Sequence, residues 1–197
     1  AKKNLKGEHV GAYATFDTRG NQLVQAKISS SFISHNQALI NLKRELPDNL
    51  SFNQTVSQGR ELWNKELSRI KVTTGNSEVD LSNKIKFYSC FYRTILFPRE
   101  FHEYDSKNKQ IHYSPYNGQI LDGPLYTDNG FWDTFRAVFP FYTLLYPEKL
   151  GEIMQGIMVN PYLESGWLPE WSSPGHRDCM IGSNSASIIA EAYIKGI

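Results

Sequence analysis

A single carboxylate stands between large aromatic side chains in the stretch GWLPEW, residues 166–171. Pro169 and the glycine that opens the stretch disfavour a helix, so Glu170 is expected in a loop and not on a solvated helical face. Burial beside aromatic rings favours the protonated form of a carboxyl group, which is the form that a general acid needs. The alternative is an ion pair of Glu170 with His176 or Arg177, which would stabilise the charged form and remove the acid role. The residues alone leave both interpretations open.

A second stretch, TDNGFWDTFR at residues 127–136, combines an indole, a carboxylate and a guanidinium group. On a helix that begins near Phe131, Trp132 and Arg136 are four residues apart and share a face. One interpretation is a polyol site, in which Trp132 stacks on a sugar ring while Asp133 and Arg136 bind adjacent hydroxyl groups. The other is structural: Asp133 caps the helix, Trp132 fills the core and Arg136 pairs with a neighbouring acid.

The residues after GWLPEW have the mixed composition of a binding loop. His176, Arg177, Asp178 and Cys179 follow one another directly, and this spacing is not that of a metal site. The other cysteine is Cys90, and the sequence leaves open whether the two form a disulfide or remain thiols. The sequence contains no Gly-rich phosphate loop, no GxSxG nucleophile motif and no Ser/His/Asp order of catalytic residues, and its metal ligands are unknown.

The charge balance excludes some classes of partner. The chain has 21 Lys and Arg residues against 20 Asp and Glu, with a net charge of +1 and no basic stripe, so nucleic-acid binding is not expected. No apolar run reaches the ~18–20 residues that span a bilayer, and the first residues lack the apolar region of a signal peptide. The 11 Tyr, 11 Phe and 4 Trp fit either a large core or a surface that stacks on sugar rings.

The first half of the chain is predicted to change from strands to helices. Alternation and a turn at Gly20-Asn21 predict a hairpin of residues 9–16 and 23–30. Ser34 and Gln37 fit a capping box that opens a helix, which Pro47 ends. Apolar residues at helical spacing predict a second helix over residues 53–71, with a buried stripe at Val56, Trp63, Leu67 and Ile70.

The second half is predicted to consist of helices joined by long loops. Helices are expected over residues 81–96, 131–145, 147–160 and 183–195, with Pro147 opening the third, Pro161 ending it and Gly196 stopping the last. A small hairpin is expected around residues 105–108, and a long loop over residues 164–182. Loops of this length in a compact domain are usually functional. Paired helices separated by loops suit an α/α toroid.

Five blocks of sequence carry a resemblance to a known family: YRTILFPR (92–99), HYSPYNG (112–118), TDNGFWDTFR (127–136), GWLPEWSSPGHR (166–177) and IGSNSAS (181–187). Together they resemble glycoside hydrolase family 92, a family of calcium-dependent exo-α-mannosidases, and the likeness extends from about residue 10 to residue 197. The resemblance implies an α+β chain with the end of a β-sandwich, linker helices and the first part of an (α/α)6 barrel. It places the sandwich with its following helix at residues 1–50, a linker helix at 51–75 and the toroid at 76–197.

The resemblance also implies roles for individual residues. Glu170 matches the general acid of an inverting mechanism, in which a second carboxylate activates water at ~6.5–9.5 Å from the acid. Trp132 and Asp133 match the mannose subsite, and the substrate-binding set is completed by Arg136, Trp171, His176 and Arg177. The PEW form followed by GHR is similar to members that cut α-1,2 links.

Some expected parts of that family are missing from the sequence. The base motif, of the type GNDDxGQ, is absent, as is a His-Glu pair linked to substrate and calcium binding. We therefore expect the base and the calcium ligands to lie in a remainder of the parent polypeptide, with export to the periplasm, cell surface or medium by analogy. This chain alone is then an inactive and self-associating fragment that acts on mannose-containing glycans only with its complement. The alternative is a non-catalytic mannose-binding or assembly piece.

Overall fold

The computed structural model describes residues 6–20 and 23–197, and its N-terminal part is extended chain. The hairpin predicted for residues 9–16 and 23–30 is wrong, because the described residues of both segments belong to no strand; Asn21 of the predicted turn lies outside the described residues. Tyr13, Leu23 and Ile28 are all more than four-fifths exposed, at 94%, 85% and 85%. A two-stranded hairpin without a further layer to cover it is not stable in water, which explains the absence of pairing.

Helix α1 (His35–Glu45) begins as predicted, with Ser34 accepting a hydrogen bond from the backbone N–H of Gln37. The capping box is only half formed, because the Gln37 side chain is used elsewhere. Its amide donates to the carbonyl of Tyr104 (2.7 Å) and to Asn41 (2.9 Å). Glu103 accepts from the same Asn41 (2.6 Å), so α1 is fixed to the strand that carries Glu103 by polar contacts.

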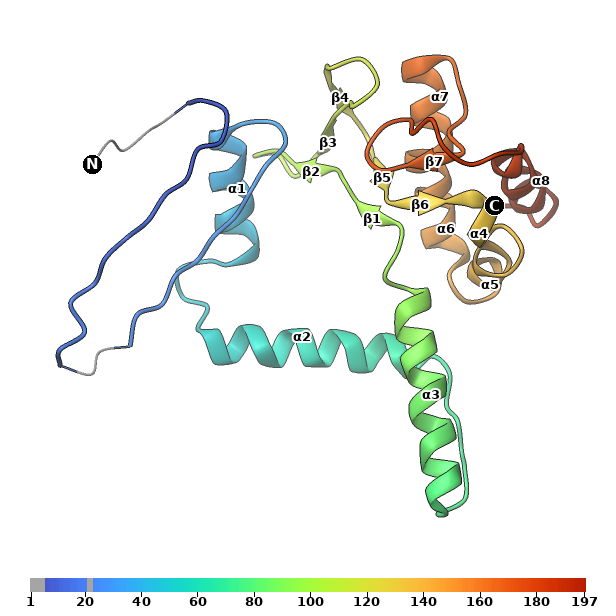
Figure 1. Ribbon diagram of the computed structural model, residues 1–197, viewed down its shortest axis with the longest axis horizontal. Helices are drawn as coiled ribbons and strands as arrows, with labels where there is room; N and C mark the ends of the chain where they lie inside the picture. Colours follow the sequence, from blue (N-terminus) through green and yellow to red (C-terminus); the bar gives the residue numbers. More distant parts are fainter. Residues whose placement is uncertain (1–5, 21–22) are drawn as a thin grey trace.

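Helices α2 (Phe52–Leu67) and α3 (Glu78–Thr94) begin at complete capping boxes on Ser51 and Ser77. Figure 1 shows α3 projecting away from the rest of the chain, with α2 crossing beside its C-terminal end. No residue of α2 is buried, so the predicted buried stripe is wrong; Trp63 instead stacks on Tyr92 of α3 with ring centroids 4.5 Å apart.

Short antiparallel strands connect α3 to the remaining helices. Strand β1 (Arg99–Glu100) pairs with β5 (Tyr126–Thr127), and β2 (Glu103–Tyr104), β3 (Gln110–Tyr113) and β4 (Ile120–Asp122) form a meander. The turn between β2 and β3 confirms the predicted small hairpin, with Asn108 at a positive φ of 65°. Strand β6 (Asn129–Gly130) pairs with β7 (Trp171–Ser172), far along the chain.

The helix predicted over residues 131–145 is two helices, α4 (Phe131–Thr134) and α5 (Val138–Leu145). Pro140 explains the break, because it has no N–H and its ring would collide with the carbonyl of Arg136 in a continuous helix. Arg136 also donates from its guanidinium to the carbonyl of Trp132 (2.5 Å), the acceptor that a continuing helix would use.

Pro161 does not end the helix that Pro147 opens, which corrects the prediction. Helix α6 (Pro147–Met154) continues through a π-helical turn, η1 (Gln155–Val159), into α7 (Asn160–Ser165), and it ends at Gly166 with a φ of 81°. The π-helical turn changes the pattern of backbone hydrogen bonds just before Pro161. The helix can therefore continue although Pro161 has no backbone N–H to donate. Gly156 lies in this turn because a Cβ there would meet the ring of Tyr126 at 2.7 Å.

The last helix, α8 (Asn184–Ile194), confirms the predicted element, and Gly196 follows it with a φ of 76°. Helices α4, α5, α6 and α8 pack around a core to which η1 and β5 also contribute. Its buried members are Tyr126, Phe131, Phe139, Tyr142, Leu150, Ile153, Ile157, Met158 and Ile188. The mixture of helices and short strands confirms the α+β class. This core and the strands around it position the residues described next.

Candidate active site

The β6–β7 pair joins the two sequence blocks that were predicted to carry chemistry. Gly130 lies opposite Trp171 in this ladder, and the backbone N–H of Phe131 donates to the carbonyl of Glu170 (3.1 Å). The Trp171 ring packs directly over the Gly130 backbone, where a Cβ would stand 2.6 Å from its nearest ring carbon. The structure therefore places Glu170 immediately beside the start of α4, which carries Trp132.

The carboxylate of Glu170 binds the N-terminus of α8. The backbone N–H groups of Asn184 and Ser185 donate to its two oxygens, at 2.9 Å and 3.3 Å. The Ser185 hydroxyl (2.5 Å) and the Asn184 side-chain amide (3.4 Å) donate to it as well. Ser183 makes no side-chain capping bond, so Glu170 supplies the acceptor that the first turn of the helix needs.

The Ser185 hydroxyl can bind the Glu170 side chain in both of its protonation states. The Ser185 side chain is buried, with 2% exposure, and a hydroxyl group can donate to a carboxylate or accept from a carboxylic acid by rotating its proton. The backbone N–H of Asn184 remains bonded to the other oxygen in either case. The surroundings of Glu170 can therefore hold the charged and the neutral side chain in the same position.

Helix α4 presents Trp132 and Asp133 to the surface, whereas Phe131 of the same helix is buried. Trp132 is 44% exposed, so it does not fill the core, and Asp133 is exposed beside it. The Arg136 guanidinium lies over the Trp132 ring at 4.9 Å and over the Phe135 ring at 4.4 Å. The three predicted ligand-binding side chains are thus accessible, and stacking holds the guanidinium near the indole.

His176 bonds to the last residue of α7 and Arg177 to its own loop, and neither bonds to Glu170. His176 Nε2 lies 2.9 Å from the Ser165 hydroxyl, and burial lowers the pKa of His176 from its ordinary 6.5, with Asp178 partly offsetting this. Arg177 donates through Nε to the carbonyl of Ser173 (2.7 Å). The ion pair of Glu170 with His176 or Arg177 is therefore wrong. The Glu170 carboxylate is bound instead by the N-terminus of α8.

Asp128 is a residue of this region that the sequence analysis missed. It has a positive φ of 62°, and it accepts hydrogen bonds from Arg99 Nε (2.5 Å) and from the Ser173 hydroxyl (2.9 Å). It therefore ties β1 to the loop that follows Glu170. A signal was present, since Asp tolerates the left-handed region and precedes Asn-Gly in the sequence.

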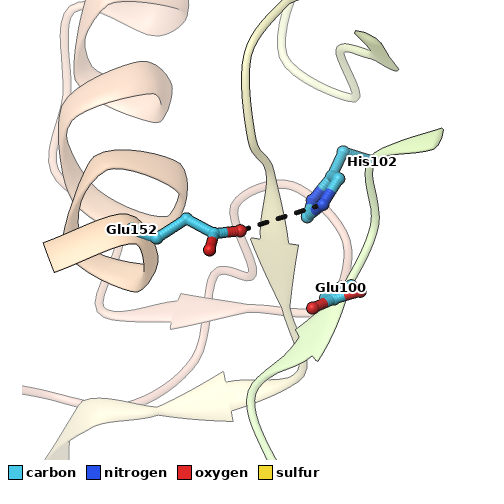
Figure 2. A group of neighbouring side chains, drawn as sticks. All are labelled: Glu100, His102 and Glu152. Atoms are coloured by element: carbon cyan, nitrogen blue, oxygen red, sulfur yellow. Dashed lines mark ion pairs between the residues drawn. The ribbon is translucent and has the colours of Figure 1, made fainter. Parts of the chain in front are cut away.

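One group of His and acidic side chains lies close enough to surround a metal ion within the described residues: Glu100, His102 and Glu152. His102 lies in the segment between β1 and β2, and Glu152 lies in α6. Figure 2 shows the two side chains directed toward one another; His102 Nε2 is 4.0 Å from Glu152 Oε1. A cation is already present, because the Lys149 ammonium bonds Glu100 (2.7 Å) and Glu152 (3.3 Å). These contacts raise the pKa of Lys149 against the opposing effect of its burial.

The same group does not fit calcium. Calcium takes about 6–8 oxygen ligands, whereas His102 offers nitrogen and that nitrogen already faces the Gln110 amide at 3.2 Å. Glu152 Oε1 accepts from the Tyr126 hydroxyl (2.7 Å), so it too is engaged. Burial raises the pKa of Glu152, but Tyr126, Lys149 and Gln110 more than offset this and lower it overall. The group is a hydrogen-bonded ion network and not a calcium site.

Neither cysteine is in a disulfide: Cys90 and Cys179 are both exposed and free. Within residues 6–20 and 23–197, the helices are all too short or too polar to cross a bilayer.

Comparison with known proteins places this geometry in a family. Residues 37–197 match the glycosyl hydrolase family 92 catalytic domain. The structure is similar to that of the GH92 inverting mannosidase of Bacteroides thetaiotaomicron, with a TM-score of 0.78 and 52% identity over 84% of this chain and 22% of that one. A GH92 α-mannosidase of the same organism gives a TM-score of 0.73 and 29% identity, again over 84% of this chain and 22% of that one.

A curated relative extends the likeness to the N-terminal segment. An uncharacterized secreted glycosidase of Arthroderma benhamiae is 26% identical over 199 residues, which cover 98% of this chain and 21% of that protein. The chain thus spans about a fifth of the length of the relatives that it matches.

Proposed function

Because the chain belongs to glycosyl hydrolase family 92, we propose that it carries the acid side of an exo-acting α-mannosidase site that inverts the anomeric carbon. The observation that carries the proposal is the β6–β7 ladder, which holds the backbone of Glu170 beside the start of α4, the helix that carries Trp132 and Asp133. One of the similar structures is that of an inverting mannosidase, which supports the stereochemical outcome.

In this proposal Glu170 protonates the departing glycosidic oxygen. Ser185 accommodates the side chain before and after it loses the proton, because its hydroxyl can accept or donate. The N–H groups at the start of α8 favour the carboxylate that is left behind. The group therefore does not have to move between the two states.

The exposed side chains around Glu170 bind the sugar. Trp132 offers a flat apolar face to the pyranose ring, and Asp133 accepts hydrogen bonds from its hydroxyl groups. Trp171, His176 and Arg177 border the same loop, and Arg136 stacks on Trp132. We assign an α-1,2 link as the preferred substrate, based on the PEW and GHR pattern of residues 169–177.

The remaining parts of the mechanism are assigned to a longer polypeptide that contains this chain. A base carboxylate at ~6.5–9.5 Å from Glu170 would activate the attacking water. Calcium would be held there too, since the Glu100 network does not fit it. The N-terminal segment 1–50 would complete a β-sandwich, 51–75 would link the domains and 76–197 would begin an (α/α)6 barrel; the secreted relative supports export.

The test uses the enzyme expressed from its complete reading frame. Hydrolysis of α-1,2-mannobiose with calcium should release β-mannose first, as seen by proton NMR, and α-1,3- and α-1,6-mannobiose should react more slowly. Glu170→Gln should lower kcat/KM by about 10²–10⁴-fold, which is the usual contribution of a general acid. Initial release of α-mannose, or a near-normal rate for Glu170→Gln, would disprove the mechanism.

A second function is favoured by the exposure of two indole rings, Trp167 at 74% and Trp132 at 44%. The same loops would then bind mannose without cleaving it, as a binding or assembly piece. Two measurements separate the two functions: calorimetric titration of the 197-residue chain with mannose, and a hydrolysis assay of the complete protein. Binding of mannose by the chain without hydrolysis by the complete protein supports this alternative, whereas hydrolysis supports the enzyme.

A further inference from the structure

His112 of β3 has an unusual hydrogen-bond environment: both of its ring nitrogens face acceptor atoms. Nδ1 lies 2.9 Å from the carbonyl oxygen of Gly123, and Nε2 lies 2.9 Å from Oε1 of Glu164 in α7. The imidazole is fully buried and the Glu164 side chain is 6% exposed. Both contacts are therefore direct and shielded from water.

The two contacts require an additional proton. A neutral imidazole has one N–H, so it can satisfy only one of two acceptors. The pair must hold either an imidazolium beside a carboxylate or a neutral imidazole beside a carboxylic acid. Burial lowers the pKa of His112, but Glu164, the Gly123 carbonyl and the charge of Asp122 on β4 more than offset this, so the net pKa is raised above 6.5. These contacts favour the imidazolium form beside the carboxylate.

Glu164 depends on this proton. Its second carboxylate oxygen, Oε2, is buried and has no hydrogen-bond partner among the described residues. Tyr116 is the other titratable group nearby; burial raises the pKa of its hydroxyl, and the charge of Glu164 adds to the rise. Losing one proton from His112 would leave one ring nitrogen with a lone pair, facing either the Gly123 carbonyl or Glu164, and would leave the buried carboxylate without a compensating charge, which is unfavourable.

Glu164 stands directly before the loop that carries Glu170. The next residue, Ser165, accepts from the backbone N–H of Trp167 and donates to its carbonyl, both at 3.1 Å, and it also contacts His176. Gly166 then turns the chain out of α7. The β6–β7 ladder fixes the end of this loop near Glu170, and the His112–Glu164 pair fixes its beginning.

We propose that His112 is a positioning residue for Glu170: its ion pair with Glu164 fixes the start of the catalytic loop, and loss of the imidazolium proton weakens this attachment by removing its charge and one of the two hydrogen bonds of the ring. The proposal rests on the acid role proposed above for Glu170. It predicts that activity falls on the alkaline side through the titration of this pair, in addition to any titration of Glu170 itself.

His102 is a matched control. It is a buried histidine, with 8% exposure, and its Nδ1 also faces a carbonyl, that of Leu125, at 3.2 Å. Its Nε2 faces the amide of Gln110 (3.2 Å), which is a donor, so these two contacts need one ring proton. Replacing His102 tests the loss of a buried imidazole that does not hold the loop.

The experiment compares two α-mannosides in the complete enzyme, one with a methyl leaving group and one with a 2,4-dinitrophenyl leaving group that departs without protonation. Glu170→Gln should lower kcat/KM on the methyl mannoside by about 10²–10⁴-fold and affect the activated substrate far less. His112→Asn should show the same selectivity with a loss of about 10²-fold, because misplacing a catalytic group costs about that much. His102→Asn should affect both substrates equally.

The pH dependence supplies the second readout. Glu164→Gln replaces the acceptor with an amide that donates to Nε2 of a neutral His112, so it should retain more activity than Glu164→Ala. We also compare the rate at about pH 9 with the rate at neutral pH. This ratio should be higher for Glu164→Gln than for the unsubstituted enzyme, because the variant has no imidazolium–carboxylate pair that can lose a proton.

The outcomes separate the two proposals. Suppose that Glu170→Gln lowers kcat/KM mainly on the methyl mannoside, whereas His112→Asn lowers it equally on both substrates. This result would overturn the positioning role of His112 and leave the acid role of Glu170 intact. Equal losses for Glu170→Gln would overturn both. If His112→Asn does not fold, nitrogen NMR of the unsubstituted protein decides: two protonated ring nitrogens of His112 at about pH 7 are expected, and one would overturn the proposal.

Discussion

Replacing Glu170 with alanine removes the side chain that accepts from the first backbone N–H groups of α8. Asn184 and Ser185 would lose a charged acceptor at 2.9 Å and 3.3 Å, and the buried Ser185 hydroxyl would lose its partner at 2.5 Å. Ser183, at the capping position, makes no bond that could take over. The helix contributes Ile188 and Ala192 to the core, so its stability affects the whole packed region.

The expected cost follows from these contacts. Loss of an N-terminal cap costs about 0.5–2 kcal/mol, and a negative charge at a helix N-terminus contributes about 0.3–1 kcal/mol. Glu170 is half-buried, so water will replace part of the lost hydrogen bonding. We expect Glu170→Ala to lower the free energy of unfolding by about 1–2 kcal/mol, and Glu170→Gln by about half as much because one carbonyl oxygen remains.

Urea unfolding followed by circular dichroism measures this loss, and amide hydrogen exchange at Ser185 localises it. Glu191→Ala is the matched control on the same helix, since Glu191 pairs with Lys195 at a surface site (2.6 Å) and should contribute less than about 1 kcal/mol. A Glu170→Ala protein as stable as the Glu191→Ala protein, with unchanged exchange at Ser185, would refute the capping role.

Three further predictions concern the surrounding structure. Gly130→Ala places a methyl group 2.6 Å from the Trp171 ring, so it should destabilise the protein by about 1–3 kcal/mol and shift the indole fluorescence. Unchanged stability would contradict the close packing. The raised pKa of His112 means that its pair with Glu164 stabilises fully below about pH 6.5 and loses this effect as the pH rises through the raised value. Relative to Glu164→Gln, the unfolding free energy of the unsubstituted protein should therefore fall as the pH rises above about 6.5, and parallel profiles would disprove it. Lys149→Gln removes the ammonium between two carboxylates, so zinc affinity measured by calorimetry should rise above that of the unsubstituted protein; equal affinity would show that the ammonium does not block metal binding.

Elements with local signals were predictable from the sequence. Helices α2 and α3, which Ser51 and Ser77 cap, begin close to the predicted starts at residues 53 and 81. Gly196 follows α8, as predicted. The Asp105–Asn108 turn was also predictable, because Asp and Asn support tight turns through their own side chains. These features depend on a few neighbouring residues, which the sequence lists in order.

The errors have three physical origins. Pro140 was overlooked as a break, although its missing N–H and its ring exclude a continuous helix at that point. Pro161 was given too much weight, because a π-helical turn before it removes the need for its N–H. The predicted N-terminal hairpin failed for a third reason: strand pairing needs a partner surface, and periodicity alone does not supply one.

The candidate site shows the same division between local and distant information. Residue types identified Glu170 and Trp132 as chemical groups, but the ladder that brings them together involves Gly130 and Trp171, which are 41 positions apart. The partner of Glu170 was also accessible in principle, because a helix N-terminus attracts a carboxylate. The ion-pair interpretation, one of the two that the sequence left open, instead paired Glu170 with the nearest cations, and the structure shows that Arg177 bonds to the backbone and His176 to a hydroxyl.

The position of Glu170 therefore depends on three segments that must fold together. The ladder with Gly130 sets its backbone, the N-terminus of α8 sets its carboxylate, and the His112–Glu164 pair sets the start of its loop. Only the second of these contacts touches the carboxylate itself. It follows that weakening α8 should lower activity through the orientation of Glu170 without changing sugar contacts, whereas weakening the ladder should change both, because it moves Glu170 relative to the side chains of α4.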